Sequence, residues 1–256
     1  MTTFIPLDRA KHGSQTWRKP ADYAFAGSEA AVPIVAVEAA IAAVNMPLAF
    51  ARSGEHTQLV AVLSARPGRN SFVDEDGRWL GAYIPAAFRT FPFRLGRVEG
   101  RDEHVLCIAS EGDHLAQGDQ PIYEESGELS AQVQQIVSFL NTFEASRQQA
   151  LAAGAALIEA GVLAPWPIRV RDQSGSDRTI GGMLRVDEQA LSAVSDKAFL
   201  KLRRLGALGL AYAQMLSVSR LEILSRLSYL ATSRAQSRKK ELNLDFLREE
   251  DGNLVF

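Results

Sequence analysis

The sequence predicts an α+β protein in which a mainly antiparallel sheet is packed by one long central helix and by C-terminal helices. Three observations support this prediction: short apolar runs separated by polar turns over 48–110, a helical apolar pattern over Leu129–Gly161, and repeated helical spacing over 187–238. Strands joined by short turns pair antiparallel, whereas parallel strands need long crossovers. We therefore expect a single domain over residues 1–256, with an irregular N-terminal segment, 1–32, and a helical C-terminal region, 187–240.

The first half of the chain predicts a helix followed by a block of strands. Proline and glycine punctuate residues 1–32, so no long element is expected there. Ile34–Asn45 is alanine-rich with helical spacing, and Pro47 cannot continue that helix. The elements expected next are strands over 48–52 and 58–65, a hairpin over 70–79 around Asp76-Gly77, a short helix over 83–89, and paired strands over 91–98 and 104–110.

The second half is dominated by helices. Apolar residues from 133 to 140 follow the i, i+3, i+4, i+7 spacing of a buried helical stripe. Ser130 is expected to cap this helix, Gly154 to interrupt it and Gly161 to end it. Two more strands are then predicted over Val162–Val170 and Thr179–Val186, with a bulge at Gly181-Gly182.

Composition excludes several classes of protein. A net charge of −2 gives no general attraction to nucleic acid, so no nucleic-acid partner is expected. The single cysteine, Cys107, cannot form an intramolecular disulfide, which fits a reducing compartment. No secretory signal is expected, because the N-terminus has no long apolar stretch after a basic one. No membrane span is expected, because the most apolar windows are interrupted by charged residues and prolines or are too short. We therefore expect a cytoplasmic protein.

Charge is distributed unevenly along the chain. Acidic residues dominate 101–128, and basic residues dominate 197–240. These stretches could meet within the chain, meet between the subunits of a homo-oligomer, or attract a charged partner. They could equally be two solvated faces, because exposed charge pairs contribute little to stability.

No established catalytic or cofactor motif occurs, and we expect neither a metal nor a cofactor. His114 lies near Glu111 and Asp113, but one histidine beside two acids is more typical of an exposed acidic loop than of a metal site. Cys107 stands in the apolar run VLCIA without an adjacent base, as a buried strand cysteine does. Nor do the glycine-rich stretches match a phosphate-binding loop.

The densest cluster of aromatic residues is WLGAYIPAAFRTFPFRLG, residues 79–96. Its arginines could bind an anionic or peptidic ligand through bidentate hydrogen bonds while its rings stack against it. Alternation in a strand would instead bury Phe91 and Phe93 and leave Arg94 outside. Both interpretations stay open. The predicted ligand-binding residues are Trp79, Tyr83, Phe88, Arg89 and Arg94.

Four stretches of the chain resemble the bacterial SapC family. They are VPIVAVEAAIAAVNMPLAFA, GRWLGAYIPAAFRTFPFRL, CIASEGDHLAQGDQPIYEESGELSAQVQQIVSFL and IGGMLRVDEQALSAVSDKAFLKLRRLGALGLAYAQMLS. Members are often encoded near flavin-dependent halogenase-like proteins, cupin-like proteins and TonB-dependent receptors. The resemblance therefore implies an accessory role in nutrient uptake or peptide modification, and it supplies no catalytic residue.

These observations favour a non-catalytic accessory or binding protein that recognises a peptide or protein partner. Two alternatives remain: a peptide-modifying enzyme whose site is assembled from scattered residues, and a subunit that assembles through its charged stretches. The catalytic residues of such an enzyme cannot be assigned from the sequence.

Overall fold

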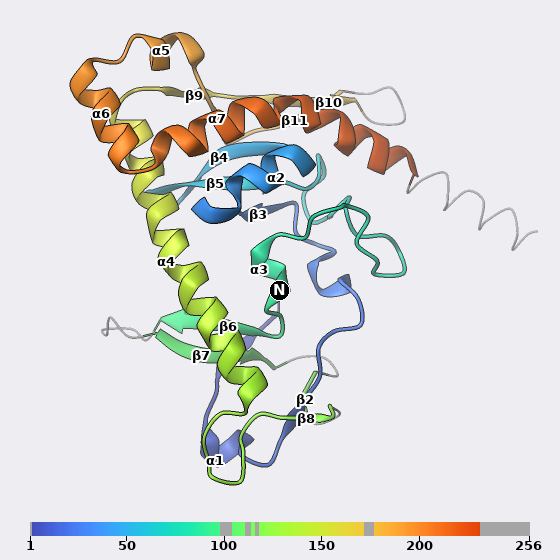
Figure 1. Ribbon diagram of the computed structural model, residues 1–256. Coiled ribbons are helices and arrows are strands. Elements are labelled where there is room, and N and C mark those ends of the chain that lie inside the picture. The colour runs from blue at the N-terminus through green and yellow to red at the C-terminus, as the bar shows by residue number, and fades with distance from the viewer. Residues whose placement is uncertain (1, 98–103, 111–113, 116–117, 172–176, 231–256) are drawn as a thin grey trace, which may run out of the picture.

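The computed structural model in Figure 1 describes residues 2–97, 104–110, 114–115, 118–171 and 177–230. It confirms an α+β fold, in which every strand pair is antiparallel. The acidic turn at 99–102, the loop acids Glu111 and Asp113, and the basic stretch 231–240 lie outside the described residues.

The larger sheet has five strands in the order β3-β5-β4-β12-β9. Its strands are β3 (Ala31–Pro33), β4 (Leu48–Ser53), β5 (His56–Val62), β9 (Leu163–Pro165) and β12 (Met183–Val186). The predicted hairpin between 48 and 65 forms its centre, in a register that runs from Leu48 opposite Ala61 to Ser53 opposite His56. Phe50 and Leu59 lie opposite each other on one face of this hairpin, and Ala49 and Val60 lie opposite each other on the other face. All four are buried, so both faces of the sheet are covered there.

Helices cover this sheet. The helix predicted over 34–45 consists of a 3-10 turn, η2 (Ala36–Glu38), and α2 (Ala39–Asn45). The C-terminal helices are α5 (Glu188–Ser192), α6 (Asp196–Arg204), α7 (Ala207–Ser217), the 3-10 turn η3 (Val218–Arg220) and a helix over 221–230. α7 packs against α2 and β4, which joins the N-terminal and C-terminal parts of the chain in one core.

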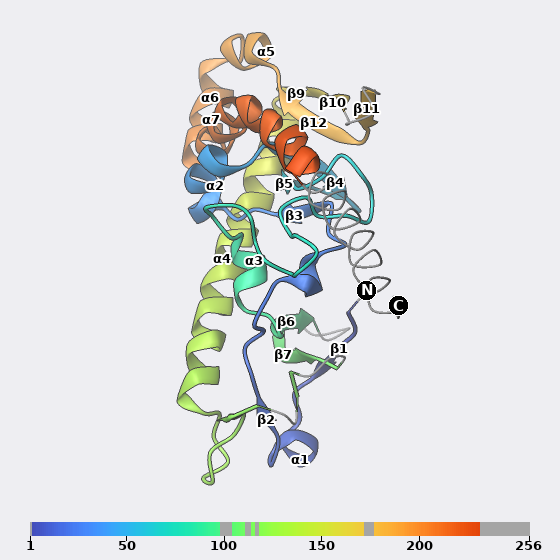
Figure 2. The ribbon, with the colours of Figure 1, turned by 90° about the vertical axis from the view of Figure 1, so that its right-hand side faces the viewer.

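A second, smaller sheet lies further along α4, below the first in Figure 2. It has the order β1-β7-β6, built from β1 (Phe4–Pro6), β6 (Phe93–Arg97) and β7 (His104–Ala109). The pairing predicted between 91–98 and 104–110 is confirmed, but these strands do not join the larger sheet. β1 occupies the free edge of β7, so the N-terminal segment contributes a strand that its irregular sequence did not predict.

Several short elements extend from the middle of the molecule to its lower end in Figure 1. They are α1 (Arg9–His12), β2 (Thr16–Trp17), the 3-10 turn η1 (Ala24–Ala26), α3 (Ala86–Arg89) and β8 (Gln120–Pro121). β2 pairs with β8, and Trp17 from this pair enters a separate hydrophobic core with Phe93 and Ile108. At the opposite end, β10 (Ile168–Arg171) and β11 (Asp177–Ile180) form a two-stranded ribbon.

The long predicted helix is α4 (Ala131–Glu159), and it links the two cores. Gly154 does not interrupt it: a side chain there would collide with the Thr57 carbonyl oxygen of β5, so glycine permits close packing. Gly161 follows the helix with φ +67°, as predicted for its end. Ser130 occupies the N-cap position, but its hydroxyl makes no capping hydrogen bond.

Parts of the two charged stretches lie at opposite ends of α4 (Figure 1). Residues 118–128 precede the helix at its lower end, whereas α6 packs against its upper end. Residues 118–128 and α6 therefore do not meet within one chain. Among all the residues that the structure describes, no helix is both long enough and apolar enough to cross a membrane.

Candidate functional site

The clearest candidate binding site is a groove of about 320 Å³ beside the first half of α4. α4 supplies one wall, the segment 89–91 after α3 supplies another, and β2 and β8 close the lower end. Its lining residues are Trp17, Lys19, Arg89, Thr90, Phe91, Gln120, Gln132, Gln135, Ile136 and Phe139. We call this the Arg89 groove.

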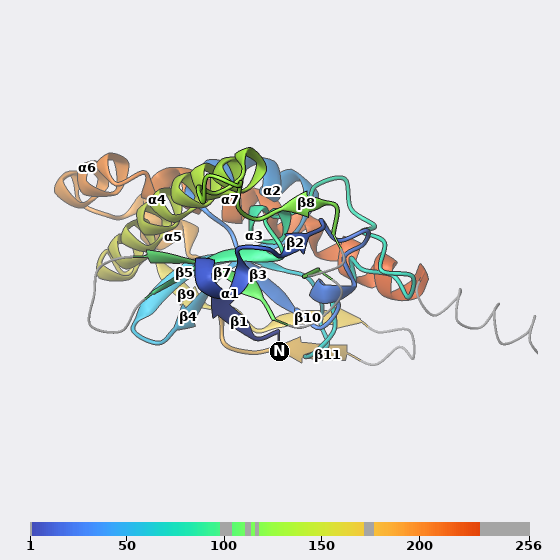
Figure 3. The ribbon, with the colours of Figure 1, turned by 90° about the horizontal axis from the view of Figure 1, so that it is seen from below.

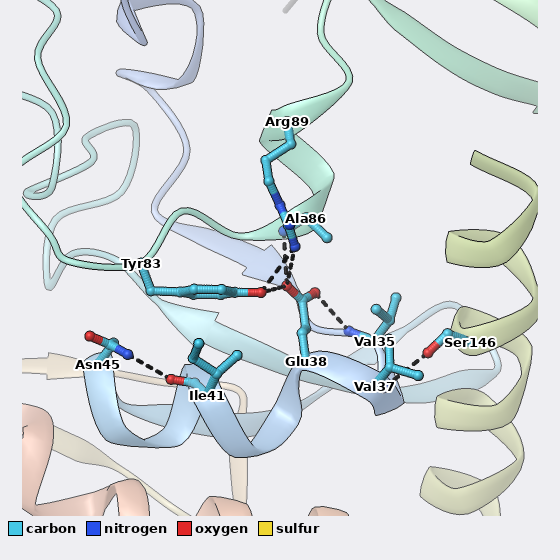
Figure 4. A network of polar contacts seen from close by, with 9 residues as sticks. All are labelled: Val35, Val37, Glu38, Ile41, Asn45, Tyr83, Ala86, Arg89 and Ser146. Carbon is cyan, nitrogen blue, oxygen red and sulfur yellow. Dashed lines mark hydrogen bonds and ion pairs between the residues drawn. The ribbon is translucent and has the colours of Figure 1, made fainter. Parts of the chain in front are cut away.

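A buried carboxylate organises the wall behind Arg89. Glu38 ends η2 and lies at the centre of the polar network in Figure 4. Its side chain is only 3% exposed. One carboxylate oxygen accepts a hydrogen bond from the Val35 amide at 3.1 Å. The other accepts from the Tyr83 hydroxyl at 2.6 Å and from the Ala86 amide at 2.8 Å. Glu38 thus ties the start of α2 to the start of α3.

Arg89 extends this network to the surface. Its guanidinium donates to the Tyr83 hydroxyl at 3.1 Å and lies 3.8 Å from Glu38 Oε2. The same group lies over the rings of Tyr83 and Phe139, at 5.6 Å and 5.4 Å from their centroids. A guanidinium has five N–H donors, and only one of Arg89's is used in a protein hydrogen bond among the described residues. The remaining donors are available to a ligand.

The Tyr83 hydroxyl is a fixed donor rather than a base. Burial raises its pKa, and so does the hydrogen bond to Glu38, while Arg89 lowers it by less. Tyr83 is therefore neutral at physiological pH and donates its proton to Glu38. Because the oxygen also accepts from Arg89, this side chain orients the guanidinium without carrying charge itself.

The five residues predicted to bind a ligand occupy different environments. Arg89 lines the groove, and Tyr83 lies behind it. Trp79 donates from Nε1 to the Tyr83 carbonyl at 2.9 Å, which fixes the loop before α3. Phe88 is 8% exposed and packs on Trp79 and Phe25, so it supports the site from the core. Arg94 projects from β6, where its guanidinium stacks 3.9 Å from the Phe4 ring.

The phenylalanines of this segment also divide between core and groove. Phe93 is 1% exposed and buried in β6, whereas Phe91 precedes the strand and lines the groove. Phe91 stacks face to face on Phe25, with ring centroids 3.9 Å apart. The alternation expected in a strand therefore applies to Phe93 and Arg94 but not to Phe91.

Several groove residues were not predicted from the sequence. Phe139, Gln132 and Gln135 lie on the exposed side of α4, and Trp17 and Lys19 come from the segment predicted to be irregular. Glu38 carried one usable signal, since it is the only charged residue of the apolar run IVAVEAAIAAV. A charge in such a run is buried only when it is paired or hydrogen-bonded.

Other candidate chemistry is not supported at this site. Burial raises the pKa of the Cys107 thiol by more than Arg94 lowers it, and Cys107 is 5% exposed in β7. His114 stands edge-on to Phe91, with ring centroids 4.9 Å apart. Among the residues that the structure describes, no three His, Cys, Asp or Glu side chains gather as a metal site would require.

Comparison with known proteins places the chain in a family. The model of the family described as SapC matches residues 7–224, which include the five-stranded sheet, β6 and β7 of the smaller sheet, α4 and the Arg89 groove. No curated protein matches the chain, and no solved structure matches it either.

Proposed function

This chain belongs to the SapC family, and we propose that it is a non-catalytic accessory or binding protein that recognises a peptide or protein partner through the Arg89 groove. The observation that carries this proposal is the partly exposed Arg89, held by Tyr83 and Glu38 at the edge of an aromatic groove. We propose a cytoplasmic setting and a role connected with nutrient uptake or peptide modification.

The groove offers the groups that an extended peptide needs. Trp17, Phe91 and Phe139 provide apolar surface for side chains, and aromatic surface of this kind dominates peptide recognition. Amides from Gln120, Gln132 and Gln135 can both donate to and accept from a peptide backbone.

The charge of the groove favours an acidic peptide. Arg89 and Lys19 both line it, and no carboxylate does so among the described residues. Glu38 lies behind Arg89 with both oxygens occupied by hydrogen bonds. A ligand carboxylate could therefore bind Arg89 through two parallel hydrogen bonds.

The experiment starts from peptides selected against the full chain from a phage-displayed random library. Their affinities are then measured by calorimetry for Arg89→Gln and Phe139→Ala. Loss of a central arginine or aromatic contact is expected to weaken binding about tenfold or more. Arg94→Gln is the matched control, because Arg94 belongs to the same segment but does not line the groove.

Two results would count against the groove. One is selected peptides that bind Arg89→Gln and Phe139→Ala as tightly as the unaltered chain. The other is equal weakening in Arg94→Gln, which would indicate a non-specific effect of charge. Turnover of a selected peptide, lost together with binding in Arg89→Gln, would favour the alternative of a peptide-modifying enzyme.

A further inference from the structure

A second cavity lies beside β10 and β11. Figure 3 shows these strands on the side of the molecule away from α4. Three separate parts of the chain form the cavity: the loop after β5, the β10–β11 ribbon and the helix over 221–230. Its described lining residues are Ser64, Ala65, Arg66, Arg69, Ser71, Val170, Arg178, Leu224 and Ser228. Three arginines and three serines thus converge on one small cavity that no described carboxylate lines.

The loop after β5 has a fixed conformation. Asn70 is 1% exposed, and its side chain donates to the Ala26 carbonyl at 3.1 Å and accepts from the Phe72 amide at 2.9 Å. The Ser71 amide donates to the Leu63 carbonyl at 3.0 Å, which closes the loop at its base. Gly68 turns the chain with φ +69°. This loop is therefore anchored before any ligand binds.

Two buried serines lie at the base of the cavity. Ser64 and Ser71 are 4% and 8% exposed, and their hydroxyl oxygens are 3.2 Å apart. Ser64 Oγ also accepts from the Arg66 amide at 3.0 Å. The pair has two hydroxyl protons, and one is used between the serines. No acceptor for the other occurs among the described residues, although buried hydroxyls are normally satisfied.

The arginines add positive charge around these hydroxyls. Arg66 is half-buried and Arg69 is exposed, and neither forms an ion pair or a side-chain hydrogen bond within the described part of the chain. Arg178 approaches from β11. An anion bound beside Arg66 and Arg69 supplies the opposite charge that neither finds within the described residues.

We propose that this cavity binds a phosphate group. One phosphate oxygen enters the cavity, whose volume of about 20 Å³ suits a single oxygen atom, and accepts the spare serine proton. The remaining oxygens lie at its mouth, where Arg66, Arg69 and Arg178 approach from different directions. Donors that approach from different directions fit a tetrahedral oxyanion better than a planar carboxylate. The paired N–H groups of a guanidinium also match the spacing of two phosphate oxygens. This site is separate from the Arg89 groove and does not depend on peptide binding there.

The test is calorimetric titration of the full chain with sodium phosphate and with phenyl phosphate, against sodium chloride of equal ionic strength. Arg66→Gln and Ser64→Ala are expected to weaken phosphate binding about tenfold or more, since each removes a hydrogen bond to a charged group. Arg203→Gln is the matched control, because Arg203 is exposed on α6, away from the cavity.

The outcomes separate a built site from general charge attraction. If phenyl phosphate binds more tightly than inorganic phosphate, the site is supported and its ligand class is a phosphate monoester. If inorganic phosphate binds and phenyl phosphate binds equally or more weakly, the site is supported and its ligand is free phosphate. The proposal is overturned if neither probe gives more binding heat than sodium chloride does. It is also overturned if Arg66→Gln keeps full affinity for phosphate, or if Arg203→Gln loses as much affinity as Arg66→Gln. Circular dichroism checks the fold, and if Ser64→Ala does not fold, the surface variant Arg66→Gln decides.

Discussion

The role of Glu38 as the hub behind the Arg89 groove can be tested by its removal. Its carboxylate is almost fully buried and accepts hydrogen bonds from two backbone amides and one hydroxyl. Truncation in Glu38→Ala leaves the Val35 and Ala86 amides without their acceptor and separates α2 from α3. Substitution by glutamine keeps the volume but places an NH₂ group where one of the acceptor oxygens was.

The magnitudes follow from these contacts. Breaking a buried charged network by removing one partner costs about 3–5 kcal/mol, which we expect for the unfolding free energy of Glu38→Ala. Glu38→Gln retains one acceptor oxygen and loses the charge, so a loss of about 1–3 kcal/mol is expected. Arg89→Gln should cost less than about 1 kcal/mol, because that side chain is 43% exposed and its ion pair is long.

Urea unfolding measures all three variants, with the slope against denaturant checked for constancy. Glu29→Gln serves as the control, because Glu29 is exposed on the same N-terminal part of the chain. A decrease of less than about 1 kcal/mol in the unfolding free energy of Glu38→Ala, as for a surface substitution, would refute the role of Glu38 as a hub. So would equal losses in Glu38→Ala and Arg89→Gln, since the buried carboxylate would then contribute no more than the exposed arginine.

Two further predictions concern α4. Gly154→Ala should lower the free energy of unfolding by about 1–3 kcal/mol in urea, because the added methyl group would collide with Thr57. Gly209→Ala is the control: this position on α7 faces open space, so alanine should raise the free energy of unfolding by about 0.5–1 kcal/mol. Stabilisation by both changes would contradict the close packing of α4 on β5. The bidentate hydrogen bonds from Arg147, at 2.6 Å and 2.7 Å, lower the pKa of Glu144. Their stabilisation is therefore complete above the unfolded pKa near 4.5 and is lost as the pH falls through the folded pKa. The stability difference between the unaltered chain and Arg147→Gln should shrink between pH 6 and pH 3, and a constant difference would contradict this linkage.

The elements best predicted from the sequence are those that a local pattern of apolar residues specifies. The β4–β5 hairpin and α4 depend on apolar periodicity within one segment, and both form close to their expected bounds. The division into two sheets could not be predicted in this way. It depends on β1, a strand of three residues that pairs with β7 about a hundred positions later, and no local pattern marks such a partner.

The same distinction applies to the Arg89 groove. The segment 79–96 was identified by composition, but composition could not show which arginine faces a cavity. Arg89 ends α3 and is held by Tyr83 and Glu38, 45 positions apart from each other in sequence. Phe139, the second aromatic residue beside the Arg89 guanidinium, comes from α4 and could not be predicted from segment 79–96 alone.

The different positions of Arg89 and Arg94 make a sharp test of recognition. Both side chains stack on aromatic rings, so both retain a similar local environment for the guanidinium. Only Arg89 also lies beside a buried carboxylate and lines the groove. Replacing each by glutamine removes the same charge from the same segment of the chain. A ligand attracted by net charge should respond equally to both changes, whereas a ligand seated in the groove should respond to Arg89→Gln alone.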